Sequence, residues 1–186
     1  MPHFRTRDIA AIALCASLWG VLNSIFSPII FRMFGLPILC DLIGFTLLTL
    51  TVWWIRKLGS ATAVGLIATV ITFMLNPTGT QFLGFTAACI VFDVAVRLVG
   101  YDNAFSKTIQ SVVTLVPIST MSAAVAGYLI GTFFMVAPAL ARWGGVLGWA
   151  ALHAVGGVIG GSIGVVLVNA LRARRVVVPS LQARTI

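Results

Sequence analysis

Residues 53–80 read WWIRKLGSATAVGLIATVITFMLNPTGT and contain one complete membrane-crossing pattern. The basic pair Arg56-Lys57 precedes the apolar run 60–75, and the polar turn 76–80 follows that run. Basic residues next to a span favour the cytoplasmic side of a membrane. Asn-Pro followed by Gly is typical of a tight turn. The stretch therefore predicts a helix that crosses a membrane, with a charged inner end and a polar outer turn.

The composition of the whole chain extends this interpretation beyond one segment. The 186 residues are 60% hydrophobic and only 9% charged, and the mean hydropathy is +1.09. A soluble domain carries about 25% charged residues, so this chain has too little polar surface to cover a water-soluble globule. We expect a multi-pass protein of the cell (plasma) membrane, with the lipid bilayer as its solvent. The first apolar stretch has no clear small-residue cleavage site and is interpreted as a span.

Apolar runs of suitable length predict six transmembrane helices in one all-α membrane domain. The fifth run is too long for one simple span, and we expect Pro117 to kink it or to separate an interfacial segment from the span. The expected organisation is a single domain over residues 1–175 and a short basic cytoplasmic tail over residues 176–186. The predicted spans are Asp8–Ile30, Ile38–Ile55, Ser60–Leu75, Gln81–Val99, Thr108–Ala139 and Gly145–Leu171.

The basic residues predict the orientation of these spans. The net charge is +8, with twelve Lys and Arg, and if six spans alternate only Arg32 and Arg142 lie on one side of the membrane. The other ten lie on the opposite side, which places both termini in the cytoplasm. Orientation explains the positive charge better than nucleic acid does, so no nucleic-acid partner is expected. The ten are Arg5, Arg7, Arg56, Lys57, Arg97, Lys107, Arg172, Arg174, Arg175 and Arg184.

Polar and aromatic side chains gather near the outer ends of the predicted spans. A polar side chain inside a span usually faces protein or a cavity, so their convergence predicts a pocket that opens to the outside. The candidate substrate-binding residues are Asn23, Asp41, Asn76, Gln81, Tyr128, Trp149 and His153.

A purely structural interpretation of these residues stays open. In it, Asn23 forms an interhelical hydrogen bond and Asp41 pairs with Arg32 at the interface. His153 is then a hydrogen-bonded histidine of the bundle, and the aromatic residues only pack. The convergence of all seven residues, and no single one of them, carries the pocket hypothesis.

Small residues four positions apart occur in the first and last spans, and such rows let membrane helices approach closely. In the last span, HAVGGVIGGSIG (153–164) is interpreted as packing within the bundle. The first span carries small residues on more than one face, which leaves one face available for a different protein. The candidate partner-docking residues are Ala11, Ala13, Cys15, Ala16, Ser17 and Gly20.

The sequence contains few of the residue patterns that enzyme active sites use. The helix around His153 is similar to the histidine helix of a rhomboid protease, but no Gly-x-Ser-Gly stretch precedes it. Asp93, four residues before Arg97, is interpreted as half of an acid–base pair on one helix face. The three cysteines show no pair spacing, and no phosphate loop or metal cluster is present. We expect no enzyme, no cofactor and no metal, but a binding subunit that borrows its energy from partners.

The chain resembles the substrate-binding membrane subunit, or S component, of energy-coupling factor (ECF) transporters. The resemblance covers nearly the whole chain: six spans in fewer than 200 residues, cytoplasmic termini and small-residue rows in the first span. It also includes the progression FGLPILCDLIGF (34–45), the stretch 53–80 quoted above, and GFTAACIVFDVAVRLVGY (84–101). The Asn-Pro-Thr-Gly turn, with an acidic residue about a span later, is more loosely similar to the thiamine and hydroxymethylpyrimidine branch.

The resemblance implies partners and a ligand that the residues alone do not. An S component binds a vitamin or vitamin precursor near the outer face and docks on a transmembrane coupling protein, which two ATPase subunits drive. An Ala-x-x-x-Ala motif in the first span contacts the coupling protein; here Cys15, Ser17 and Gly20 stand where alanine would. Asp41 would suit a cationic or amine-bearing ligand, with Tyr128 or Trp149 stacking on a ring. The alternatives are a structural or assembly membrane protein without a ligand and, third, a rhomboid-like protease.

Overall fold

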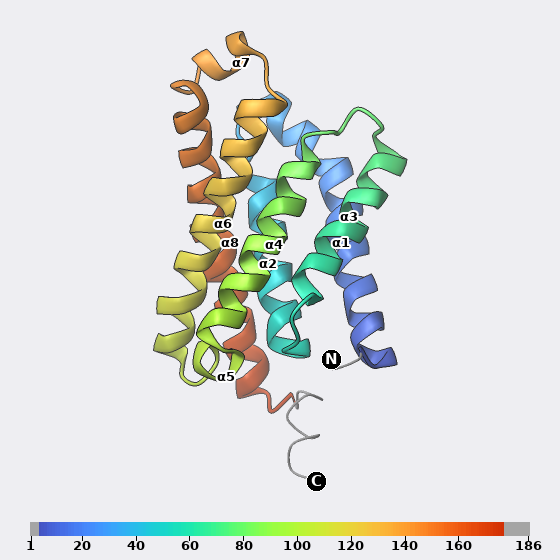
Figure 1. Cartoon of the computed structure of the whole chain (residues 1–186), viewed down its shortest axis with the longest axis vertical. Coiled ribbons are helices and arrows are strands. Elements are labelled where there is room, and N and C mark those ends of the chain that lie inside the picture. Colours follow the sequence, from blue (N-terminus) through green and yellow to red (C-terminus); the bar gives the residue numbers. More distant parts are fainter. Residues whose placement is uncertain (1–3, 177–186) are drawn as a thin grey trace.

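The computed structural model describes residues 4–176, which form six long helices and two short ones (Figure 1). The long helices are α1 (Thr6–Phe34), α2 (Ile38–Ile55), α3 (Ser60–Leu75), α4 (Phe82–Val99), α6 (Thr108–Phe133) and α8 (Gly145–Ala173). The short helices are α5 (Tyr101–Ala104) and α7 (Ala137–Ala141). Residues 177–186, which make up nearly all of the expected basic tail, lie outside the described residues.

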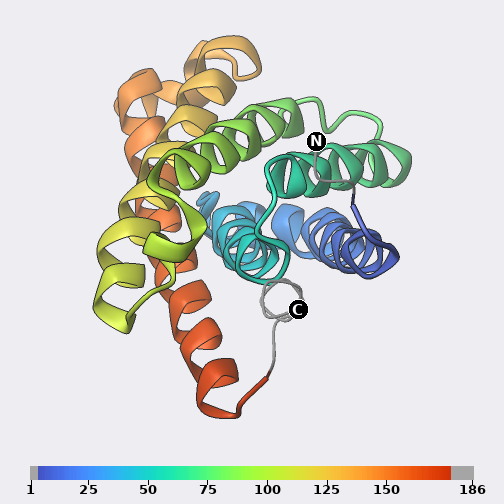
Figure 2. The same ribbon diagram turned by 60° about the horizontal axis from the view of Figure 1, so that its bottom comes forward.

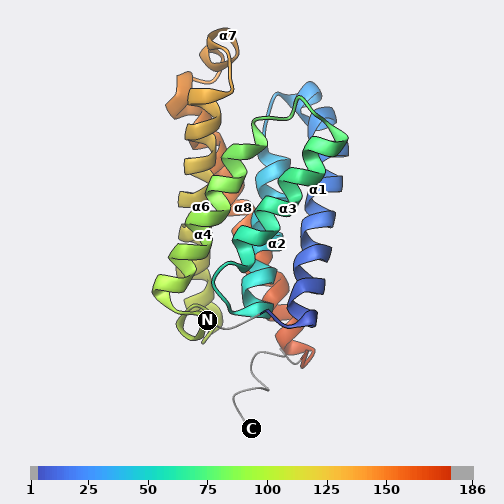
Figure 3. The same ribbon diagram turned by 45° about the vertical axis from the view of Figure 1, so that its right-hand side comes forward.

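Successive long helices run in opposite directions, so the bundle has two distinct ends (Figures 1 and 3). The lower end holds the start of α1, the α2–α3 turn, α5 and the end of α8. The upper end holds the α1–α2 connection, the turn 76–81 and α7. Seen with the lower end turned forward, α6 and α8 lie on one side and α1 and α3 on the other, with α2 between them (Figure 2).

The molecule is an all-α, multi-pass membrane protein. Five helices are long and apolar enough to cross a membrane: α1, α2, α4, α6 and α8. Large apolar side chains face outward, among them Leu98, Met74 and Ile109, each more than 75% exposed. Such surfaces are stable only against an apolar solvent. At 16 residues, α3 is shorter than the about 20 residues that a perpendicular span needs.

The helix bounds agree closely with the hydrophobic pattern, and the main difference lies in the fifth predicted span. The helix α6 runs without interruption through Pro117, so the expected separation at this proline is wrong. The chain instead leaves the helix after Phe133 and forms the short helix α7 at the upper end. Proline is tolerated within a membrane helix where neighbouring groups satisfy the freed backbone.

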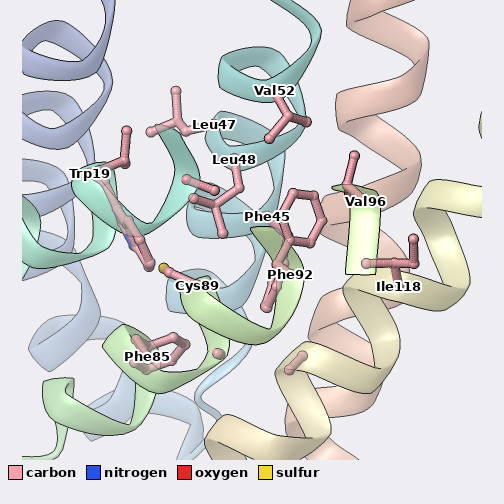
Figure 4. Close-up of a cluster of buried hydrophobic side chains, with 14 of the residues drawn as sticks. Trp19, Phe45, Leu47, Leu48, Val52, Phe85, Cys89, Phe92, Val96 and Ile118 are labelled. Carbon is pink, nitrogen blue, oxygen red and sulfur yellow. The ribbon is translucent and has the colours of Figure 1, made fainter. Parts of the chain in front are cut away.

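The core is built around α2, with aromatic side chains from α1 and α4 packed against it (Figure 4). Phe45 and Phe92 have ring centroids 6.0 Å apart, and both are almost fully buried. Trp19 fits against Gly44, where a Cβ would lie 2.5 Å from the indole ring. The aromatic contacts thus join α1, α2 and α4 into one packed unit.

The glycine rows of α8 pack inside the bundle, as the sequence indicated. A Cβ on Gly160 would lie 2.7 Å from the Asp41 carbonyl oxygen of α2. A Cβ on Gly157 would lie 2.7 Å from the Ser119 carbonyl oxygen of α6. Because side chains are absent at these positions, α2 and α6 approach the α8 backbone from two directions.

The carboxylates of the lower end have partners within the protein. Asp8 lies 2.7 Å from Lys57, and Asp102 lies 3.0 Å from Arg56. Asp93 accepts hydrogen bonds from the backbone N–H groups of Gly59 and Thr62, at 2.9 and 3.0 Å, and from Thr62 Oγ1 at 3.0 Å.

The expected pairing of Asp93 with Arg97 is therefore corrected. Asp93 points from α4 to the start of α3, where the first backbone N–H groups of a helix lack intrahelical partners and favour an anion. Arg97 is exposed near the end of α4.

Candidate binding site

A cavity of about 350 Å³ opens at the upper end of the bundle. It lies between the upper parts of α1, α2, α3, α4, α6 and α8, beside the turn 76–81. Its wall combines aromatic and aliphatic side chains with a few polar ones, which is the usual composition of a small-molecule site. The polar and charged wall residues are Asn23, Ser24, Ser27, Arg32, Thr72, Asn76, Gln81 and His153.

A buried Asp–His pair supports one wall of the cavity. His153 Nδ1 lies 2.9 Å from Asp41 Oδ2 and 3.1 Å from Asp41 Oδ1. Both residues are almost fully buried, but only His153 contributes to the cavity wall. Gly156 makes this position possible, since a Cβ there would lie 2.6 Å from the Asp41 Cβ. The carboxylate therefore orients the imidazole from behind and does not itself face the cavity.

Aromatic rings form the apolar part of the wall. Trp149 packs edge-on against Phe31 and His153, with centroid distances of 6.1 and 5.4 Å. Phe85 lies 5.5 Å from the His153 ring and 5.3 Å from Phe82. Because α1, α4 and α8 each supply part of this set, the wall exists only when the three helices are packed together.

Three buried polar atoms of the wall residues have no hydrogen-bond partner among the described residues. They are Thr72 Oγ1, Trp149 Nε1 and His153 Nε2. These atoms have almost no exposed surface, and eight other buried polar atoms of the described residues also lack a hydrogen bond, among them atoms of Ser60, Asp93 and Tyr101 at the lower end. The three atoms alone therefore do not distinguish the cavity, whereas the mixed aromatic and polar wall does.

Side-chain hydrogen bonds hold two of the asparagines that line the cavity, Asn23 and Asn76. Ser27 Oγ donates to Asn23 Oδ1 within α1, and Thr78 Oγ1 donates to Asn76 Oδ1 at 2.7 Å within the turn.

Arg32, in the last turn of α1, also lines the cavity. It does not pair with Asp41, which corrects the alternative raised for that carboxylate, because Asp41 is turned inward to His153.

The structure brings five of the seven candidate substrate-binding residues to the cavity: Asn23, Asn76, Gln81, Trp149 and His153. Asp41 lies behind the wall and acts through His153. Tyr128 does not line the cavity; it lies on the outer surface of α6 and is 50% exposed. Periodicity located Tyr128 along its helix, but only packing decides which face of the helix turns inward.

Sequence reasoning missed the aromatic wall and the charged rim. Phe31, Phe82 and Phe85 are apolar residues within apolar spans, so nothing in the sequence distinguishes them from lipid-facing residues. Arg32 was assigned to membrane orientation and to a pair with Asp41, but not to a pocket, and Thr72 lies within an apolar run. The one available signal was proximity, since Phe82 and Phe85 directly follow the polar turn.

The candidate docking residues of α1 divide between two environments. Ala13 and Ser17 are exposed on one face, and Ala11 and Cys15 are half-buried. Ala16 and Gly20 are buried, and a Cβ on Gly20 would lie 2.9 Å from the Ile71 side chain of α3. Gly20 therefore belongs to the packing between α1 and α3 and Ala16 to the interior of the bundle, which corrects their assignment to a docking surface.

Among residues 4–176, no group of three or more His, Cys, Asp or Glu side chains is placed to hold a metal ion. Comparison of the chain with family models, with curated proteins and with solved structures found no match. The cavity and the chemistry of its wall are therefore the features of this chain that bear on its function.

Proposed function

We propose that the protein is the substrate-binding membrane subunit of an ECF-type importer in the plasma membrane. It captures a small vitamin-like molecule from outside and passes it on through a coupling protein driven by two ATPase subunits. The cavity at the upper end, with its wall of aromatic and polar side chains, is the observation that carries the proposal.

The distribution of charge supports an outward-facing cavity. Nine of the eleven Lys and Arg residues within 4–176 lie at the lower end, and only Arg32 and Arg142 lie at the upper end. Basic ends of membrane helices favour the cytoplasm. In this orientation α3 is a sixth crossing. It has only 16 residues, and its outer end continues into the polar turn 76–81.

The Asp41–His153 pair has the geometry of an acid–base dyad, but its surroundings favour binding over catalysis. In a Ser-His-Asp site, the second imidazole nitrogen hydrogen-bonds to the nucleophile. Within the described part of the chain, no hydroxyl group hydrogen-bonds to His153 Nε2. The pair therefore lacks the nucleophile that a catalytic dyad uses, and it orients the His153 ring in the cavity wall.

Native mass spectrometry of the detergent-purified protein, followed by denaturing extraction, tests the binding function. We expect one vitamin-sized molecule per chain, released on denaturation. A protein without such a molecule, which also gives no thermal shift with a panel of vitamins and precursors, would contradict the proposal. That result would favour a structural or assembly role in the membrane.

The exposed face of α1 supports docking of a partner helix. Ala13 and Ser17 lie four positions apart on it, and a small-residue row permits close helix approach. Co-expression with the ECF coupling protein and ATPases of the same cell tests this part. Ala13→Leu and Ser17→Leu are expected to abolish co-purification without changing ligand binding.

A matched control separates docking from folding. Leu18 is exposed on α1 and already large, so Leu18→Ala should leave co-purification unchanged. Ala16→Leu, by contrast, is expected to reduce the yield of folded protein because Ala16 is fully buried. Undiminished co-purification of both Ala13→Leu and Ser17→Leu would contradict docking through this face.

A further inference from the structure

We infer that the ligand of the cavity is a soluble ring compound bearing an anionic oxygen group, a carboxylate or a phosphate. This inference rests on the proposed binding function and specifies its substrate class. It reverses the expectation of a cationic ligand drawn from Asp41, and it depends on where the acidic groups, the hydrogen-bond donors and Arg32 lie.

No acidic side chain is available to a cation in the cavity. The chain has four Asp and no Glu, and all four lie within the described residues. Three are at the lower end, bonded to Lys57, to Arg56 and to the start of α3. The fourth, Asp41, is covered by His153 and does not line the cavity.

The buried pair leaves the second imidazole nitrogen of His153 without a hydrogen bond among the described residues. Nε2 is a donor when a carboxylate faces an imidazolium, and also when a protonated carboxyl donates to Nδ1 of a neutral imidazole. Nε2 is an acceptor when a carboxylate accepts from Nδ1–H of a neutral imidazole. His153 therefore suits either role, and the sign of the ligand's charge depends on Arg32 and on the position of the acidic groups.

The polar groups of the wall residues are chiefly donors. The guanidinium of Arg32 can only donate, and so can Trp149 Nε1, which has almost no exposed surface. The side-chain oxygens of Asn23 and Asn76 already accept one bond each, from Ser27 and Thr78. Each amide keeps its NH₂ group as a donor and one lone pair on its oxygen. Thr72 and Gln81 can serve in either role, so the wall as a whole favours an acceptor-rich ligand.

Arg32 supplies the charge that such a ligand requires. It is the one permanently charged residue that lines the cavity, and no acidic residue within 4–176 forms an ion pair with it. Guanidinium groups bind carboxylate and phosphate oxygens through paired N–H bonds. The aromatic rings of Phe31, Phe85 and Trp149 would contact the ring of the same ligand.

The test uses matched probes that share a ring and differ in charge. One set is benzoate, phenyl phosphate, benzamide and benzylamine; the other is indoleacetate, indoleacetamide and tryptamine. Binding of each to the full-length protein in lipid-free detergent is measured by thermal shift and calorimetry. We expect the anionic member of each set to bind at least about tenfold more tightly than the amide and the amine, a difference of about 1.4 kcal/mol.

Variants of two arginines complete the test. Arg32→Gln should weaken binding of the anionic probes about tenfold and leave the neutral amides unchanged. Arg142 is the other basic residue of the upper end and does not line the cavity, so Arg142→Gln is the matched control. Both arginines are exposed, and neither variant is expected to unfold the protein.

The outcomes distinguish this inference from the function on which it rests. Tighter binding of the amines or amides would overturn the anionic ligand but retain a binding protein. Equal loss in the Arg32 and Arg142 variants, or no loss in either, would also overturn it. An anionic lipid as the sole occupant would show that Arg32 is a membrane anchor. Failure of every probe would count against both proposals.

Discussion

The charged groups at the two ends of the bundle differ in the partners that they have within the protein. At the lower end, Asp8 and Asp102 pair with basic side chains, and Asp93 binds the start of α3. At the upper end, the only acidic group is enclosed with His153, and Arg32 lines an open cavity. The carboxylates of the lower end have partners within the protein, whereas Arg32 forms no ion pair among the described residues. On the proposed function, the lower end is structural and the upper end binds the ligand.

The largest expected effect comes from removing the imidazole at the upper end. His153→Ala leaves Asp41 buried without its partner, and breaking a buried pair in this way costs about 3–5 kcal/mol. We expect a marked fall in the unfolding temperature, measured in detergent, and complete loss of ligand binding.

A second substitution isolates the cause of that loss. Adding Asp41→Asn to His153→Ala removes the uncompensated charge, so part of the stability should return while ligand binding stays lost. If His153→Ala alone were as stable as the wild type, the pair would not be the buried support described here.

The next largest effect is expected at the lower end. Asp93→Ala removes three hydrogen bonds to the start of α3 and should lower the free energy of unfolding by about 2 kcal/mol. Thr62→Val loses only the hydroxyl bond and should cost about half as much. Ligand affinity, measured by calorimetry on the folded fraction, should not change in either variant. A large loss of affinity would contradict the assignment of this end to structure.

A smaller effect is expected from the rim of the cavity. Asn76→Ala and Gln81→Ala should each weaken ligand binding about tenfold, or about 1.4 kcal/mol, with little change in unfolding temperature. Both residues line the cavity, whereas the neighbouring Thr80 is exposed and does not, so Thr80→Ala is the control. If both variants bound every ligand of the wild type equally well, the turn would not belong to the site.

The smallest effect is expected from the ion pair between the end of α2 and α5. Asp102→Asn removes the 3.0 Å contact with Arg56, and the Asp102 side chain is 59% exposed. Pairs near a surface contribute about 0–1 kcal/mol, so the unfolding temperature should fall only slightly and ligand binding should not change. A loss as large as that of Asp93→Ala would show that this pair, too, organises the lower end.

Most of the fold was predictable because lipid imposes a simple rule on sequence. A spanning segment must be apolar and must satisfy its own backbone, so α2 and α3 begin and end where the hydrophobic pattern does. The exception was the region after Pro117. Proline is a reliable helix terminator only where water or a turn can take up the freed backbone groups, and within the bundle α6 continues past it.

The candidate site was predictable only in outline. Polar residues such as Asn76 and His153 are conspicuous in apolar spans because their burial is costly, and both line the cavity. Tyr128 looked equally suitable but faces outward. On α1, Ala13 and Ala16 looked alike in the sequence, yet one is exposed and the other is buried against its neighbours.

The sequence by itself determined that this chain is a helical membrane protein, because a composition this apolar has no stable alternative in water. It also determined which end of each span carries the basic residues. Only the tertiary structure decided that Asp41 would be enclosed by His153, that Phe31, Phe82 and Phe85 would share one wall, and that Arg32 would face a cavity. These relations join residues far apart in the chain, and they depend on which face each helix presents when it packs. A local pattern does not contain that information.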